Sequence, residues 1–127
     1  MIIYSLEPQL TASEFEHLLK ASTLAERRPK DLDTLASMLK QADIILTARA
    51  GEKLVGVARS ISDFTYCTYL SDLAVDAAFQ HQGIGKQLIR KSKEIAPKAK
   101  LILLAAPAAR DYYPKIGMTQ FEYCFYQ

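Results

Sequence analysis

Two glycines stand one residue apart in the segment QHQGIGKQLI, at residues 80–89. Gly83 and Gly85 fall where an amphipathic helix begins, and the first backbone N–H groups of a helix have no partner within it. The helix dipole adds partial positive charge at the same end, which therefore attracts phosphate. Glycine leaves room for a close approach and permits a tight loop. The segment predicts a phosphate site, although two glycines by themselves are also compatible with a simple turn.

Two familiar phosphate motifs fit this segment poorly. A dinucleotide-binding fingerprint needs a third glycine where this chain has Leu88. A P-loop needs a glycine at the position of Gln80, and Ser or Thr at the position of Gln87. A nucleotide-binding Rossmann fragment is therefore kept only as a distant alternative.

A second motif lies further along the chain. Residues 112–118 read YYPKIGM, with two aromatic residues followed by Lys-x-Gly, and residues 73–89 read LAVDAAFQHQGIGKQLI. Together these segments resemble the GNAT superfamily of acetyl-CoA-dependent N-acetyltransferases. That family's signature is Gln or Arg, two residues, Gly, one residue, then Gly or Ala, which residues 80–85 match. The resemblance spans most of the chain and is strongest over residues 54–118.

The resemblance implies that acetyl-CoA is the cosubstrate. Its pyrophosphate is expected on the backbone N–H groups of the glycine loop. Its pantetheine arm is expected along the splayed end of the preceding strand, where a β-bulge would open a cleft. The binding residues implied are Leu73, Ala74, Val75, Gln80, His81, Gln82, Gly83, Ile84, Gly85 and Lys86. No group of His, Cys and Asp has metal-ligand spacing, so no metal is expected.

Acetyl transfer to an amine needs an oxyanion donor and a proton for the departing thiolate. The resemblance points to the backbone N–H of Val75 for the first role and to Tyr113 for the second, while its neighbour Tyr112 is expected to pack. A phenol with a pKa near 10 is protonated at pH 7 and can give its proton to a thiolate. For the general base the candidates are Asp72 and Asp63, with a water relay or an acceptor amine that arrives partly neutral as alternatives.

The acceptor is expected to be a small-molecule or peptide amine. In the family, the first two helices and their joining loop form one wall of the acceptor cleft, and this loop includes STLAERRPKD at residues 22–31. Arg27 and Arg28 could bind a carboxylate or phosphate of the acceptor, or they could belong to a solvated basic loop. Aromatic candidates for the opposite wall are Phe64, Tyr66 and Tyr69.

The elements that position these groups follow from hydrophobic periodicity and from capping signals. A Thr-x-x-Glu capping box at residues 11–14 opens the first helix, and a second helix is expected to begin near Pro29. Further helices are expected at the glycine loop and near Pro107. Strands are predicted at 2–6, 43–50, 54–61, 66–75, 100–106 and 118–127. The run at 100–106 has the continuous apolar character of a strand covered on both faces, and the last run alternates aromatic and polar residues.

The resulting order is βααβββαβαβ, an α/β fold with a central mixed sheet and helices on both faces. The length of 127 residues fits a single domain over residues 1–127. A net charge of +2 does not indicate a nucleic-acid partner. No apolar run approaches the ~20 residues of a membrane helix, and a monomer or homodimer is expected.

Two cysteines, Cys67 and Cys124, form no CxxC motif or disulfide framework, which favours a cytoplasmic protein. Both fall in strand-like runs and are expected to pack as small apolar residues.

Two functions follow from this reading. The first is an acetyltransferase that moves the acetyl group to an amine by direct attack in a ternary complex, with Tyr113 as general acid. The second is a non-catalytic acetyl-CoA- or CoA-binding sensor or subunit. Many members of the family carry a Glu on the strand before the glycine motif, which this chain lacks. That absence favours the second function, as do Pro114 at a commonly acidic position and Ala106 where the family often has Asn.

Overall fold

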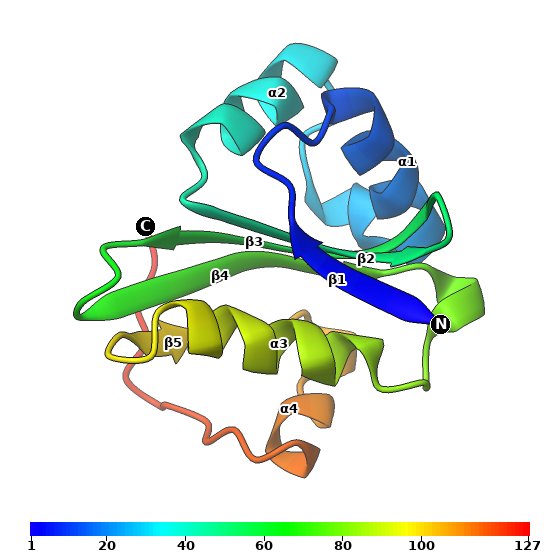
Figure 1. Ribbon diagram of the computed structural model, residues 1–127. Coiled ribbons are helices and arrows are strands. Elements are labelled where there is room, and N and C mark those ends of the chain that lie inside the picture. The colour runs from blue at the N-terminus through cyan, green and yellow to red at the C-terminus, as the bar shows by residue number, and fades with distance from the viewer.

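Five strands lie side by side in chain order in the computed structural model, which describes residues 1–127. The strands are β1 (Ile2–Leu6), β2 (Ile44–Ala50), β3 (Lys53–Ser62), β4 (Cys67–Val75) and β5 (Lys100–Ile102). β1 to β4 pair antiparallel, and β5 pairs parallel with β4. In Figure 1, α1 and α2 cover one face of this sheet and α3 and α4 lie against the other. The predicted mixed α/β architecture with helices on both faces is therefore confirmed.

Local signals fix where the helices begin. α1 (Ala12–Ser22) starts after Thr11, whose side chain accepts a hydrogen bond from the backbone N–H of Glu14 at 3.2 Å. α2 (Leu32–Gln41) starts after Asp31 and not near Pro29 as expected. The Asp31 side chain caps this helix by accepting a hydrogen bond from the backbone N–H of Thr34. The remaining elements are a 3₁₀ turn η1 (Leu24–Arg27), η2 (Ala77–Phe79), α3 (Ile84–Ile95), η3 (Pro107–Ala109) and α4 (Tyr112–Lys115).

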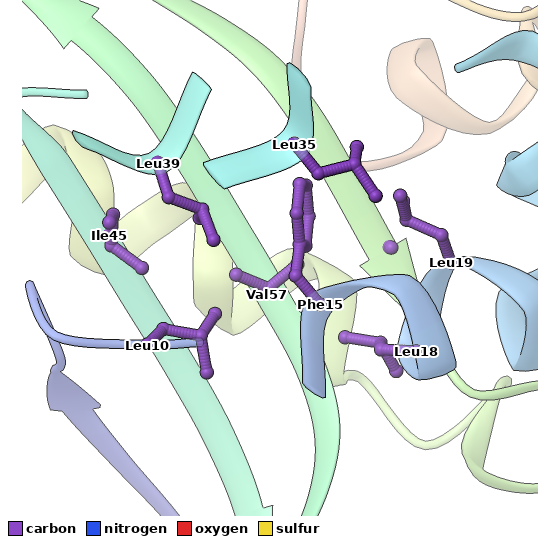
Figure 2. Close-up of a cluster of buried hydrophobic side chains, with 9 residues drawn as sticks. Leu10, Phe15, Leu18, Leu19, Leu35, Leu39, Ile45 and Val57 are labelled. Atoms are coloured by element: carbon purple, nitrogen blue, oxygen red, sulfur yellow. The ribbon is translucent and has the colours of Figure 1, made fainter. Parts of the chain in front are cut away.

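A hydrophobic core joins α1 and α2 to the sheet. Figure 2 shows Phe15 of α1 and Leu35 of α2 meeting over Val57 of β3, and all three side chains are completely buried. This cluster consists of Leu10, Phe15, Leu18, Leu19, Leu35, Leu39, Ile45, Val57 and Ala74. Helical spacing places the α1 and α2 residues on one face each, as the periodicity predicts.

A second core lies on the opposite face of the sheet. Ile84 and Leu88 of α3 pack there against side chains of β2, β3 and β4. Tyr113 and Ile116, from α4 and the residue that follows it, are half-buried against the same cluster. The second core thus holds the glycine turn and the tyrosine helix on the same side of the sheet.

β4 and β5 stay paired over a short distance only. Their parallel pairing covers Cys67–Tyr69 and Lys100–Ile102, after which β4 continues to Val75 paired with β3 on one edge and with no strand on the other. A register shift in the pairing of β4 with β3 leaves Ser71 as the extra residue between Leu70 and Asp72. The expected bulge therefore exists, but at Ser71 and not within 73–75. The sheet splits on this edge.

Of the predicted strands, the one at 100–106 is shorter than expected and the one at 118–127 does not form. The strand expected at 100–106 ends at Ile102, and two of its three residues are exposed, so it is not covered on both faces. No strand forms at 118–127, where Phe121, Tyr123 and Phe125 are exposed. Aromatic alternation favours a strand only when another strand pairs with it, and β4 alone pairs with β5.

None of the helices is long and apolar enough to cross a membrane.

Candidate active site

A cleft opens where β4 and β5 separate, with a volume of about 590 Å³. Four parts of the chain form its walls: the end of α1 with η1, the free end of β4, the first turn of α3, and residues 103–116. The first of these lies on the α1/α2 face of the sheet and the third on the opposite face (Figure 1). The cleft therefore passes through the split edge of the sheet.

The glycine turn lies at one end of this cleft. Gly83 is the N-cap of α3 and has φ +81°, a left-handed conformation that favours glycine. Gly85 is helical, and a Cβ on it would point into the cleft, 3.2 Å from the Tyr112 hydroxyl. The first N–H groups of α3 have no acceptor within the helix. The turn therefore presents bare backbone donors to the cleft.

Tyr112 lies against this turn, with its hydroxyl beside Gly85. The sequence predicted only that Tyr112 would pack. Burial raises the pKa of its hydroxyl, while the backbone N–H of Lys86 faces that hydroxyl and lowers its pKa. A phosphate oxygen at the same place would accept the same N–H group. The phenol oxygen thus marks a position at which the first turn of α3 can donate a hydrogen bond to an acceptor atom.

The free edge of β4 forms the floor of the cleft. The backbone N–H of Asp76 donates to Val55 on β3 at 2.8 Å. Because backbone groups alternate along a strand, those of Leu73 and Val75 point away from β3 and into the gap. The Gln80 side chain donates to the carbonyl of Val75 at 3.1 Å. The N–H of Val75 and both backbone groups of Leu73 remain open toward a ligand.

Tyr113 lines the same cleft from α4. Burial, and to a lesser degree the neighbouring Tyr112, raises the pKa of its phenol above the ordinary value of 10.0. The two rings meet edge to face with centroids 5.2 Å apart. Tyr113 is therefore a protonated hydroxyl at neutral pH, in a partly apolar wall.

The predicted acetyl-CoA residues gather in one place, with one exception. Nine of them line the cleft: Leu73, Ala74, Val75, Gln80, His81, Gly83, Ile84, Gly85 and Lys86. Gln82 is exposed and does not line it. His81 is exposed at the rim with φ 64°.

Neither candidate base reaches the cleft. Asp72 is completely buried, and its two carboxylate oxygens accept hydrogen bonds from Arg28 and Arg59. Asp63 lies in the β3–β4 hairpin, where backbone N–H groups of residues 65–67 bond to its carboxylate and lower its pKa. No Asp or Glu is among the residues that line the cleft.

The cleft wall at which the sequence predicted the acceptor is made mainly of small, apolar and cationic residues. Residues 22–24 contribute together with Arg27 and Arg28, as the loop prediction implied. Phe64, Tyr66 and Tyr69 do not line the cleft. Leu104, Ala108 and Ala109 line it and were not predicted, because they follow a strand that ends earlier than its apolar pattern suggests. No group of three His, Cys, Asp or Glu residues is arranged to hold a metal ion.

The chain belongs to the acetyltransferase (GNAT) family, which its sequence matches over residues 11–118. It is 29% identical over 94 residues to an Arabidopsis thaliana protein named GCN5-related N-acetyltransferase 2, chloroplastic, a match covering 66% of this chain and 36% of that protein. The chain spans about a third of the length of the curated relatives it matches.

Solved structures share the fold. A GNAT-family acetyltransferase from Streptococcus pneumoniae superposes with a TM-score of 0.78 at 22% identity, over 94% of this chain and 88% of that one. An aminoglycoside N-acetyltransferase solved in complex with CoA superposes with a TM-score of 0.77 at 18% identity, over 100% of this chain and 93% of that one.

Proposed function

We propose that the protein transfers an acetyl group from acetyl-CoA to an amine by direct attack in a ternary complex. The observation that carries this proposal is one cleft that joins a bare helix N-terminus, an unpaired strand edge and a protonated tyrosine. Family membership supports acetyl transfer as the reaction class. The solved relative in complex with CoA supports CoA as the carrier.

Binding of acetyl-CoA would use backbone groups for most of its length. The pyrophosphate would accept hydrogen bonds from the first N–H groups of α3, replacing the Tyr112 hydroxyl near Lys86. The pantetheine amides would pair with the open backbone groups of Leu73 and Val75, extending the sheet by one strand. Acetyl-CoA bound in this way would have its thioester deep in the gap between β4 and β5, within reach of α4.

The chemistry then needs three events at the thioester. The neutral amine nitrogen attacks the carbonyl carbon, and the N–H of Val75 stabilises the oxyanion that forms. The C–S bond breaks as the intermediate collapses, and the thiolate takes the proton of the Tyr113 hydroxyl. The proton that the attacking nitrogen must lose passes through water and restores the hydroxyl of Tyr113. The raised pKa of Tyr113 keeps that proton in place until the thiolate develops.

Replacing Tyr113 by Phe tests this mechanism, with Tyr112→Phe as the matched control on the neighbouring residue. We expect Tyr113→Phe to lower kcat for thiol release roughly 100-fold while the Kd for CoA stays unchanged, because only a proton donor is lost. Tyr112→Phe should retain kcat. Equal kcat in the wild type and Tyr113→Phe would contradict the assignment of the general acid.

A non-catalytic CoA-binding module is the second candidate. It is favoured by the absence of any carboxylate from the cleft lining, which leaves no side chain of that type to deprotonate an amine. Such a module would bind acetyl-CoA but release no thiol with any acceptor in an amine panel. Calorimetric binding and thiol release, measured on the same preparation, separate the two candidates.

A further inference from the structure

The charged residues that line the cleft are all of one sign. Arg27, Arg28 and Lys86 carry positive charge there, His81 lies at the rim, and no Asp or Glu is present. The phosphates of acetyl-CoA would explain positively charged residues near them. They would not explain positively charged residues on the other side of the sheet.

The cationic residues fall into two groups on opposite faces of the sheet. Lys86 stands in the first turn of α3, which packs on the second core. Arg28 bonds to Asp72, and Arg59, the other partner of Asp72, reaches the backbone of Met38 on α2. The arginine group therefore lies on the α1/α2 face, away from the pyrophosphate end.

Within the arginine group, Arg28 is fixed in place. It donates to the carboxylate of Asp72, and its Nη2 donates to the carbonyl of Ser71 at 2.7 Å. Arg59 donates to the other oxygen of the same carboxylate, and its Nη2 donates to Ser71 Oγ at 3.0 Å. Two arginines against one buried aspartate leave a net charge of +1 beside the split of the sheet.

Arg27 is different because its side chain is uncommitted. It is exposed on the cleft wall, and its guanidinium takes part in no ion pair or side-chain hydrogen bond. Its carbonyl accepts a hydrogen bond from Nη1 of Arg28 at 2.8 Å, which ties its backbone to the fixed arginine. A free guanidinium on a backbone that is tied in this way is suited to bidentate binding of a carboxylate or phosphate.

We propose that Arg27, beside the Arg28–Asp72–Arg59 cluster, is an anion subsite and that the acceptor is an amine that also carries a carboxylate or phosphate. This inference rests on the proposed acetyl transfer. A polycationic amine would meet like charge in the cleft and bind poorly. The same positive charge disfavours an ammonium ion and favours the neutral amine that attacks. The subsite thus offsets the lack of a carboxylate base.

Matched acceptors test the inference. Phosphoethanolamine is compared with ethanolamine, and β-alanine with its amide, so that each pair differs in the anionic group; spermidine represents polycations. We expect kcat/KM for at least one anionic amine to exceed that of its partner without the anionic group about tenfold or more. The two pairs distinguish a phosphate from a carboxylate. A preference for spermidine, or equal or lower kcat/KM for both anionic amines than for their partners, would overturn the inference.

Variants locate the subsite. Arg27→Ala should raise KM for the preferred anionic amine about tenfold and leave KM for the partner without the anionic group and for acetyl-CoA unchanged. Arg27→Lys should restore part of the preference. Lys30→Ala, which removes a positive charge from the same loop but outside the cleft lining, should have no effect. An unchanged preference in Arg27→Ala would overturn the assignment.

Failure of acetyl transfer itself would show differently. If no amine is acetylated, the anionic amines are titrated calorimetrically into the CoA-saturated protein. Binding that Arg27→Ala abolishes would support the subsite while acetyl transfer fails. Absence of binding overturns the subsite, and absence of CoA binding overturns the proposed function together with it.

Discussion

Tyr112 and Tyr113 carry identical side chains at consecutive positions and yet face different surroundings. Successive residues of a helix point about 100° apart, so Tyr112 reaches the glycine turn while Tyr113 packs half-buried against the second core. Burial raises the pKa of both phenols, but only Tyr112 has a backbone N–H that opposes the rise. The difference lies in the environment of each hydroxyl.

The raised pKa of Tyr113 predicts the shape of the pH profile. A general acid must hold its proton, and a pKa above 10.0 keeps Tyr113 protonated throughout the neutral and mildly alkaline range. We therefore expect kcat/KM to rise with pH as the amine loses its proton. We expect no decrease in kcat/KM at any pH up to about 10. Thiol release measured across that range checks this. A falling limb with its midpoint well below pH 9 would assign the essential acid to another group.

At the residue scale, the sequence predicted the groups that act through local geometry. Gly83, Gly85 and Tyr113 line one cleft as the motifs implied, and Tyr112, which was expected to pack, lines it as well. The roles of the carboxylates were not predictable, because Asp72 meets Arg28, which is 44 positions away in the chain. Cys67 and Cys124 are both exposed, contrary to expectation, since neither is covered by a neighbouring element.

The first turn of α3 is the element whose sequence and structure agree most closely. Gly85→Val would place two methyl groups beside the Tyr112 hydroxyl, in the space expected for the pyrophosphate. We expect CoA affinity to fall at least about tenfold, with no large decrease in the melting temperature, because valine is a somewhat better helix former than glycine. Gly83 is unsuitable for this test, since its positive φ would add backbone strain.

Gln87→Val is the matched control, because it introduces the same side chain in the same turn but outside the cleft lining. Its Kd for CoA, measured by calorimetry, should equal that of the wild type. If Gly85→Val also binds CoA normally, the pyrophosphate lies elsewhere and the glycine argument fails.

Asp72 connects the layers of the molecule. Its carboxylate lies on β4 and bonds to Arg28, just after η1, and to Arg59 on β3. We expect Asp72→Asn to lower the free energy of unfolding by about 3 kcal/mol, because two arginines lose their counter-charge in a buried site. Urea denaturation measures this loss. Asp33→Asn, at an exposed residue of α2, serves as a near-neutral control.

The same variant decides whether Asp72 is the general base. Below the denaturation transition, turnover per folded molecule should stay near that of the wild type, since Asp72 does not line the cleft. A large loss of kcat with unchanged stability would instead make Asp72 catalytic. The cytoplasmic location and the monomeric or dimeric state stay predictions.

The sequence alone determined the cap of α1, the strand and helix order through α4, and the glycine turn, because each depends on residues a few positions apart. Only the tertiary structure decided the split between β4 and β5, the place of the bulge, and the irregular course of residues 118–127. It also decided which arginine is fixed and which is free. These features depend on partners distant in the chain, and hydrogen bonding and burial between such partners follow from packing of the whole fold.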